Sequence, residues 1–580
     1  MDQQKFENLL KQQKVERETI TNKLLSSTST RKIIVSGPGT GKTYTFKELL
    51  KTKDGNCLAL TFINNLAKKL KDDLGNLAKT CTFHSFCKEL LHKIEKNNLS
   101  DNFVLLPNLE YIIKSDAEIL YDQHPTFSKS FRELDLSNKN IEFFLKRSSY
   151  YDAVSFDDSV YRVMEYLKYN PDEIPTYVQI VVDEYQDFNK LEVEFLNILS
   201  EKSPILIVGD DDQALYGLLK SASAKYIREK FNDPNYECFC LPFCSRCTLV
   251  IIQAIQDIIS RAKGKGKLQE RIDKQYFCYL PDKWEDSQKY PRIVHAHCSV
   301  QSNKAPYIAR FIEHEIDKLS SEEINASNKK GDYTVLIAGS GHYLKQVQDY
   351  FHKLHKYKLS FRKEEGHAET VKIIDGYKIL LEEGESSNLG WRIILELDRL
   401  QNIKGIMEKT RNIPSPKLIE ILSPTFVNKH INILQILMKL VHDEKITDAE
   451  KQKVEVITGM KLEKVKEVLV RKVNDSKVDI VKQENEVSVV FSTYVGCKGL
   501  QAGYVFIVGL DEESLPRNNK TPSNVEICEF IVALTRTIKK CYLISTFIFS
   551  GKRRNHSIFI DWIESKRLEL IKVNKSYFLN

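Results

Sequence analysis

Short apolar runs alternate with longer, polar, helix-like segments in the first part of the chain. Each run stops at polar residues, and the runs cover residues 33–35, 58–60, 177–182 and 205–209. A continuous apolar run of this length is typical of a strand buried on both faces, as in a parallel sheet covered by helices. The pattern therefore predicts an α/β domain with its ligand chemistry at the carboxyl ends of the strands.

The same pattern returns later in the chain, at residues 333–338, 487–491, 504–508 and 541–545. We therefore predict a second α/β domain of similar build. Two charged stretches, 92–170 and 372–484, have helical character and little strand signal, and we interpret them as mainly helical insertions, one in each α/β domain. The predicted boundaries are 1–91 with 171–245 for the first domain, and 246–371 with 485–580 for the second.

Composition fits this organisation. The 580 residues are too many for one core, and 42% hydrophobic with 28% charged residues is ordinary for a soluble protein. The formal net charge of +7 is mildly basic, which allows a polyanionic partner without requiring one. Because no apolar run approaches the ~20 residues of a membrane span and the N-terminus does not resemble a signal peptide, we expect a cytoplasmic protein with no membrane contact and with reduced cysteines.

Four cysteines lie close together in the sequence: Cys238, Cys240, Cys244 and Cys247. One interpretation is a metal site, and the other is buried strand cysteines followed by a turn. The spacing matches no common zinc pattern and no histidine lies nearby, which favours the second interpretation.

A phosphate-binding loop follows the first apolar run. Its residues are Ser36, Gly37, Pro38, Gly39, Thr40, Gly41, Lys42 and Thr43, and a helical segment comes next. Small residues let backbone N–H groups close around phosphates, and the positive end of the helix faces the same charge. Lys42 would neutralise phosphate oxygens and Thr43 would ligate Mg²⁺. Ser36 stands at the position where the pattern usually has its first glycine.

Two acidic segments follow later strands. Asp183 and Glu184 come directly after the third run, a position suited to holding Mg²⁺ on Asp183 and to polarising the attacking water with Glu184. The fourth run leads into 209–216, where the Gln213 amide can contact a γ-phosphate. Together with the loop, these residues predict a nucleoside triphosphate hydrolase that uses Mg²⁺.

In their order along the chain, the motifs resemble those of superfamily 1A DNA helicases of the UvrD/Rep type. The resemblance rests on segments 36–43, 61–67, 82–86, 183–187, 209–216, 243–246, 493–501 and 532–536. It implies two RecA-like P-loop domains around an ATP cleft, with Arg246 and Arg536 on the γ-phosphate and Gln501 at the ribose. For contact with single-stranded DNA it implies Thr61, Phe62, Asn64, His84, Tyr216, Thr493 and Lys498.

The chain also departs from the family pattern. Ser245 stands where an aromatic residue usually stacks on adenine. Segment 217–220 lacks the usual aromatic and arginine: either Leu219 replaces the arginine, or one residue is inserted and Lys220 takes its role. Gln501 stands where glutamate is usual, although its amide can still bond a ribose hydroxyl. These departures predict weaker adenine selection and a weaker base-stacking surface.

The resemblance implies an ATP-dependent helicase that moves 3′ to 5′ on single-stranded DNA and unwinds tailed duplex. A first alternative is a DNA-stimulated ATPase or translocase with little unwinding that serves a nuclease partner, for example in anti-phage defence rather than repair. A second is a non-enzymatic nucleic-acid-binding module with a degenerate nucleotide site. Five intact residues argue against it: Lys42, Thr43, Asp183, Glu184 and Arg536. No nuclease motif is recognised in the chain, so we predict no built-in nuclease.

Overall fold

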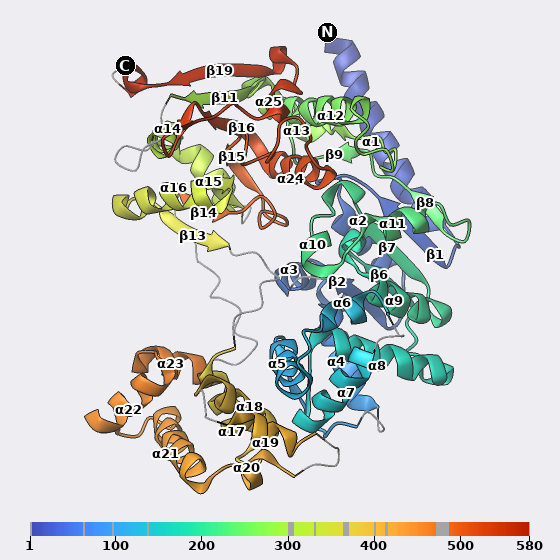
Figure 1. The fold of residues 1–580 in the computed structure, drawn as a ribbon. Helices are drawn as coiled ribbons and strands as arrows, with labels where there is room; N and C mark the ends of the chain where they lie inside the picture. The colour runs from blue at the N-terminus through green and yellow to red at the C-terminus, as the bar shows by residue number, and fades with distance from the viewer. Residues whose placement is uncertain are drawn as a thin grey trace.

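The computed structural model of the chain describes residues 3–61, 64–94, 98–135, 139–299, 307–329, 332–362, 371–398, 402–411, 416–470 and 486–578. Two large parallel sheets and many helices make up the molecule, so the predicted α/β class is confirmed (Figure 1). No helix within these ranges is long and apolar enough to cross a membrane.

The first sheet contains all four strands that the sequence predicted there. Its order is β3-β2-β6-β7-β1-β8, and every pairing is parallel. The strands are β1 (Arg31–Val35), β2 (Cys57–Thr61), β3 (Lys79–Thr82), β6 (Gln179–Val182), β7 (Ile205–Gly209) and β8 (Glu237–Phe239). The helices of this part are α1 (Gln3–Ser26), α2 (Lys42–Lys51), α3 (Asn64–Leu74), α4 (Phe83–Lys93), α9 (Lys190–Lys202), α10 (Gly217–Lys220) and α11 (Ala224–Phe231).

The second sheet has the order β13-β14-β12-β15-β16-β11-β19 and is also parallel. Its strands are β11 (Ile293–Cys298), β12 (Tyr333–Gly339), β13 (Lys358–Arg362), β14 (Ser488–Ser492), β15 (Ala502–Val508), β16 (Thr537–Thr546) and β19 (Leu568–Val573). The sequence predicted the four central strands and missed β11, β13 and β19. The helices around it are α12 (Leu249–Gly264), α13 (Leu280–Lys289), α14 (Tyr307–Asp317), α15 (Ser321–Lys329), α16 (Gly341–Leu354), α24 (Asn524–Leu534) and α25 (Ile558–Asp561).

The two insertions are mainly helical, as predicted. The first contains α5 (Leu109–Tyr121), α6 (Phe127–Arg132), α7 (Lys139–Tyr151) and α8 (Phe156–Tyr169). It also holds one short parallel pair, β4 (Val104–Leu105) with β5 (Ala153–Val154), that the sequence did not predict. The second contains α17 (Ile373–Glu383), α18 (Asn388–Leu397), α19 (Ile403–Glu408), α20 (Leu418–Ile421), α21 (Pro424–Val441), α22 (Asp448–Thr458) and α23 (Leu462–Val470).

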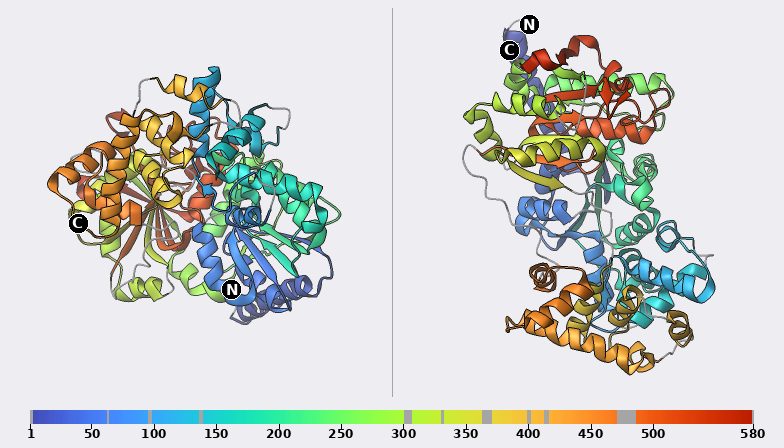
Figure 2. Two further views of the ribbon diagram at one scale, coloured as in Figure 1. Left: turned by 90° about the horizontal axis from the view of Figure 1, so that it is seen from below. Right: turned by 60° about the vertical axis from the view of Figure 1, so that its left-hand side comes forward.

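The second insertion packs against the first insertion. Both lie at one end of the molecule, with the second sheet at the other end (Figures 1 and 2). One continuous apolar core runs from the first sheet through both insertions, and it includes Leu60, Ile112, Phe144, Ile394 and Leu434. Two further cores lie on the faces of the second sheet. The second insertion is therefore joined by packing to the half of the molecule that carries the phosphate-binding loop.

Candidate nucleotide-binding site

The predicted phosphate-binding loop joins β1 to α2, and its backbone explains its glycines. Gly39 and Gly41 have φ values of +74° and +90°, which side chains with a Cβ rarely adopt. A Cβ at Gly37 would lie 2.6 Å from the Tyr276 ring, and one at Gly39 would lie 2.6 Å from Arg246 Cβ. The loop therefore needs glycine both for its conformation and because the chain packs closely around it.

Ser36 has a contact of its own at the position where glycine is usual. Its hydroxyl accepts a hydrogen bond from the Leu241 backbone N–H at 2.6 Å, which ties the loop to the segment after β8. Within the loop, the Lys42 ammonium donates to the Ser36 carbonyl at 3.2 Å, and the Thr40 hydroxyl donates to the Gly37 carbonyl at 2.9 Å. The Lys42 ammonium is thus held where phosphate oxygens would bind.

The predicted acidic pair lies directly after β6, beside Lys498 from the second α/β part. The Lys498 ammonium is 2.5 Å from Asp187 Oδ2 and 3.3 Å from Glu184 Oε2. Burial raises the pKa of Asp183 to about 7, and the Glu184 carboxylate adds to that rise. Burial opposes the charged form of Glu184 too, but Lys498 and Lys42 outweigh it and lower its pKa to about 2. The pKa values of the two neighbouring carboxyl groups are thus shifted in opposite directions.

Gln213 and Arg536 meet across the space between the two sheets. The Gln213 amide donates from Nε2 to Asp210 Oδ2 at 2.8 Å, and its Oε1 accepts from Arg536 Nη2 at 3.3 Å. Arg536 is 3% exposed and is also held by the carbonyls of Val532 and Leu500. Burial and the neighbouring Arg246 lower the pKa of Arg536 to about 10.

A cavity of about 640 Å³ opens between these groups. From the first α/β part it is lined by Lys42, Thr43, Asp183, Glu184 and Gln213, and from the second by Arg246, Gln501 and Arg536. Its size is within the usual range of small-molecule sites. An ammonium and two guanidinium groups face carboxylates and a hydroxyl, so the donor set suits a triphosphate together with Mg²⁺ on Thr43 and Asp183. Gln501 reaches this cavity while its amide donates to Asp332 Oδ1 at 2.5 Å.

Sequence reasoning missed Tyr276, which lies in the segment between α12 and the short strand β10 (Phe277–Cys278). Its hydroxyl donates to the Pro38 carbonyl at 2.8 Å, and its ring covers Gly37. On the neighbouring side of the loop, the Ser245 backbone N–H donates to the Gly39 carbonyl at 3.0 Å. No motif signals Tyr276, because the contact depends on how the chain after α12 returns to the loop.

The residues predicted to contact DNA have varied surroundings. Thr61 ends β2 and is buried, and its hydroxyl has no hydrogen-bond partner among the described residues. Phe62 lies outside the described residues, as does the side chain of Asn64. The His84 ring lies 4.6 Å from the Phe156 ring, and burial, with Lys220 and Arg132 nearby, lowers its pKa to about 3. His84 is therefore neutral near pH 7.

The other three predicted DNA contacts lie in the inter-sheet region. Tyr216 is 3% exposed and lies under two ammonium groups, those of Lys220 and Lys498, at 5.5 and 5.6 Å from its ring centroid. The Thr493 hydroxyl accepts from the Gly496 backbone N–H at 3.0 Å. Lys498 is 1% exposed and faces carboxylates rather than an open surface.

No three of the four clustered cysteines place their sulfur atoms close enough together to share a metal ion. Cys238 is exposed, whereas Cys244 and Cys247 are buried beside Arg246. Within the described ranges, the one group of three or more carboxylate, thiol or imidazole ligands close enough to share an ion is Asp210, Asp211 and Asp212. The interpretation as strand and turn cysteines is the one that agrees with this arrangement.

Comparison with known proteins adds the family context. Residues 18–218 match a family model described as an AAA domain. The chain is 27% identical over 274 residues to "ATP-dependent DNA helicase Rep" of Buchnera aphidicola subsp. Baizongia pistaciae, covering 39% of this chain and 40% of the relative. It is 25% identical over 285 residues to "ATP-dependent DNA helicase PcrA" of Staphylococcus aureus, covering 40% of this chain and 39% of the relative. The matched region thus spans about 40% of these relatives' length.

Proposed function

We propose that this chain, which is similar to UvrD-like superfamily 1 helicases, hydrolyses ATP to move 3′ to 5′ along single-stranded DNA and to unwind duplex. The observation that carries the proposal is the meeting of Gln213 and Arg536 across the cavity. A γ-phosphate group bound in this cavity would contact side chains from both α/β parts at once.

The proposed domain organisation follows the predicted boundaries, 1–91 with 171–245 and 246–371 with 485–580 for the two RecA-like domains. The insertions would be 92–170 and 372–484. Because the nucleotide site is divided between the two domains, closing them completes it and opening them breaks it.

Each side chain of the cavity has a distinct proposed part in hydrolysis. Lys42 binds phosphate oxygens from within the loop, while Arg246 and Arg536 stabilise charge on the transferring phosphoryl group. Glu184, kept charged by Lys498, accepts a proton from the attacking water. Mg²⁺ on Thr43 and Asp183 would supply further charge neutralisation. The Gln213 amide contacts the γ-phosphate. Because it also bonds Arg536, loss of the γ-phosphate changes a contact with the second domain.

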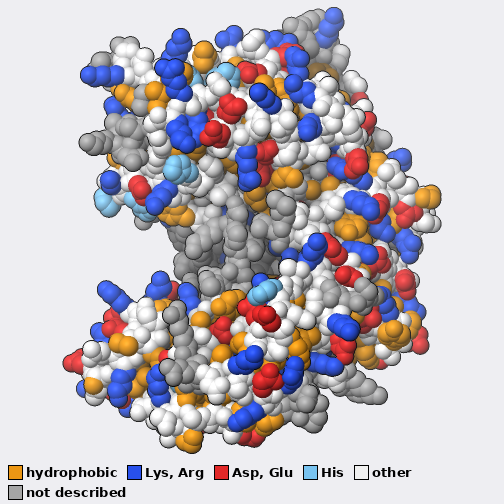
Figure 3. Space-filling model, in the orientation of Figure 1, with side chains coloured by type: hydrophobic (Ala, Val, Ile, Leu, Met, Phe, Trp, Pro, Cys, Tyr) orange, Lys and Arg blue, Asp and Glu red, His pale blue; other side chains and the backbone are white. Residues whose placement is uncertain are grey.

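DNA is the proposed partner, as single strands and as tailed duplex. The proposed contacts are the predicted ones: Thr61, Phe62, Asn64, His84, Tyr216, Thr493 and Lys498. On the face shown in Figure 3, Lys and Arg side chains are interspersed with Asp and Glu. With a formal net charge of only +7, DNA affinity should come from local phosphate contacts and should fall with salt.

The test is ATPase activity of the purified chain with and without single-stranded DNA, followed by unwinding of duplexes with 3′ or 5′ tails. We expect ATP hydrolysis that depends on single-stranded DNA, with unwinding of the 3′-tailed substrate alone. Glu184→Gln serves as the matched control, because it keeps the shape of the side chain and removes its charge.

The outcomes separate the candidate functions. Stimulated hydrolysis without strand separation would favour a translocase or sensor that acts with a separate nuclease. An ATPase rate that is unchanged in Glu184→Gln would contradict the catalytic assignment, and absence of hydrolysis together with DNA binding would favour a non-enzymatic module.

A further inference from the structure

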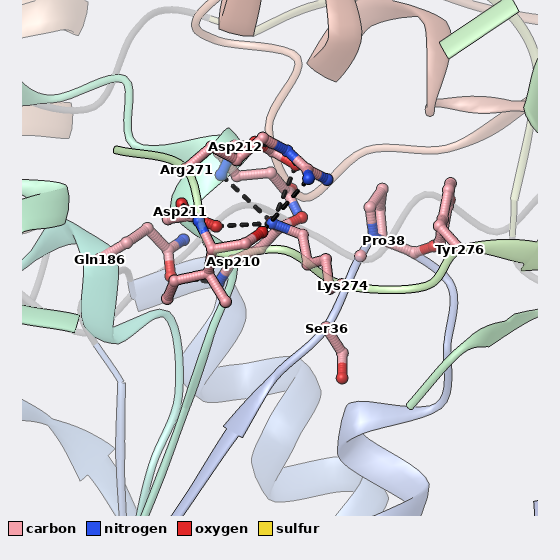
Figure 4. A network of polar contacts seen from close by, with 12 residues as sticks. Ser36, Pro38, Gln186, Asp210, Asp211, Asp212, Arg271, Lys274 and Tyr276 are labelled. Atoms are coloured by element: carbon pink, nitrogen blue, oxygen red, sulfur yellow. Dashed lines mark hydrogen bonds and ion pairs between the residues drawn. The ribbon is translucent and has the colours of Figure 1, made fainter. Parts of the chain in front are cut away.

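One segment of the second α/β part contacts both the phosphate-binding loop and the loop that carries Gln213. It comprises residues 271–276, between α12 and β10, and we call it the strap (Figure 4). At its end the Tyr276 hydroxyl holds the Pro38 carbonyl. At its start Arg271 Nε donates to both oxygens of Asp212, at 2.8 and 2.9 Å. The strap thus fixes the two loops relative to each other.

Lys274 lies at the centre of the strap with its ammonium among three consecutive carboxylates. The distances from Nζ are 2.8 Å to Asp210, 2.6 Å to Asp211 and 2.9 Å to Asp212. The Lys274 side chain is only 2% exposed. An ammonium has three N–H donors, so it can serve one carboxylate with each. Figure 4 shows these contacts converging on the lysine.

The charges of this cluster balance. Arg271 pairs with Asp212, and Arg228 Nε lies 3.3 Å from Asp211 Oδ2, so three cations face three carboxylates. Buried charges are tolerated only when they are paired and hydrogen-bonded. Lys274 is the cation of this cluster that is in direct contact with Asp210.

Asp210 connects Lys274 to Gln213. Its Oδ2 accepts from Gln213 Nε2 at 2.8 Å, and its backbone N–H donates to Gln186 Oε1 at 3.0 Å. Burial opposes the charged form of Asp210, but the Lys274 and Lys42 ammonium groups outweigh it and lower its pKa to about 2. Because the Gln213 nitrogen is fixed on Asp210, the amide oxygen points to Arg536.

We propose that Lys274 is a positioning residue for the proposed ATP hydrolysis: by holding Asp210, it fixes the orientation of the Gln213 amide toward Arg536 and the γ-phosphate. This inference rests on the proposed function. Without the ammonium, Asp210 is repelled by Asp211 and Asp212 and turns away, which frees the amide. Nucleotide affinity should change little, since Tyr276 still holds the phosphate-binding loop.

The test is steady-state ATPase kinetics of the full chain, comparing Lys274→Met, Gln213→Ala and the double variant. We expect Lys274→Met to lower kcat about tenfold to a hundredfold, the cost typical of a misplaced catalytic group. KM for ATP should stay within about threefold of the value for the unsubstituted chain, because the residues that bind ATP before hydrolysis are unchanged. If Lys274 acts through Gln213, the double variant should be no slower than Gln213→Ala alone. The matched control is Lys263→Met, since Lys263 pairs with Asp273, an exposed residue of the same strap.

A folding defect is separated by a second variant. Lys274→Met combined with Asp211→Asn restores charge balance and keeps the Arg271–Asp212 pair, but still leaves Asp210 without its ammonium. It should therefore melt near the unsubstituted chain and keep the loss of kcat. Two results would overturn this inference and leave the proposed function standing. One is a loss of kcat in the double variant with Gln213→Ala that equals the sum of the two single losses in free energy, and the other is an unchanged kcat in Lys274→Met. No hydrolysis by the unsubstituted chain would overturn the proposed function, and the inference with it.

Discussion

The Arg392 guanidinium on α18 donates to Asp116 Oδ1 on α5 at 2.8 Å, and neither side chain is exposed. The other oxygen of Asp116 accepts from Arg147 Nε at 2.7 Å and from the Tyr151 hydroxyl at 2.5 Å. Arg147 in turn donates to the Thr410 carbonyl of the second insertion at 3.0 Å. The two helical insertions therefore share one buried charge cluster.

Replacing Arg392 with methionine should loosen the second insertion from the first. The change leaves Asp116 with one cation in a buried site, and breaking a buried ion pair from one side typically costs about 3 to 5 kcal/mol. Chemical denaturation followed by tryptophan fluorescence measures the effect, because Trp391 is buried beside the substituted residue. The matched control is Lys146→Met, whose ion pair with Glu142 is well exposed and should contribute less than about 1 kcal/mol. Equal losses of unfolding free energy in the two variants would contradict a stabilising role for the charge cluster that the two insertions share.

Local patterns predicted the central strands and the chemistry at their ends. The loop 36–43 and the pair Asp183 and Glu184 are short signals, in which a few neighbouring residues specify both backbone and role. The long apolar strands β12, β14, β15 and β16 were likewise visible, because strands buried on both faces read as continuous apolar runs. The strand β13 carries lysine and arginine at its ends and is only half-buried, which weakens the same signal.

Long-range contacts could not be predicted in this way. Arg392 and Asp116 are separated by 276 residues, and each looks like an ordinary charged residue on a helix. Lys274 resembles any surface lysine until the chain after α12 brings it to three carboxylates. For Lys498 the family resemblance implies a DNA contact, but its ion pair with Asp187 depends on how the two α/β parts pack together. Such pairings are decided by tertiary packing rather than by local sequence.

Replacing Arg536 with alanine should lower kcat for ATP by about a thousandfold or more, as expected for an arginine that stabilises the transferring phosphoryl group. Nucleotide binding, measured with a fluorescent ATP analogue, should change only a few-fold, since Lys42 and Thr43 are untouched. Arg536→Lys keeps the charge but loses the fork that reaches Gln213 and the Leu500 carbonyl, so it should recover little of the rate. A kcat near that of the unsubstituted chain would rule out the assigned role.

Replacing Lys498 with methionine distinguishes a role in the nucleotide site from a direct contact with DNA. The ammonium bridges Asp187 and Glu184, so its loss should destabilise the charged form of Glu184 and lower kcat about tenfold or more. Affinity for single-stranded DNA, followed by fluorescence anisotropy, should stay within about twofold if the contact seen here is the functional one. The exposed Lys225 provides the control substitution, because it pairs only loosely with Glu229. Weak DNA binding with a normal ATPase rate would instead support the contact that the family resemblance implies.

His430 should make the second insertion less stable as pH falls. Its ring is fully buried, with the Tyr377 hydroxyl 2.6 Å from Nδ1 and Asp398 Oδ2 3.2 Å from Nε2. Burial lowers its pKa to about 4, although Asp398 opposes the change and Lys429 adds to it. In the unfolded chain this histidine takes up a proton with the ordinary pKa of about 6.5, whereas the ring in the native state stays neutral at that pH. Stability is therefore lost between about pH 6.5 and 4, with no further loss below that range.

Unfolding free energies of the unsubstituted chain and of His430→Gln, measured from pH 7 to 4.5, should show the glutamine variant losing less. Parallel curves would mean that His430 titrates alike in the folded and unfolded states.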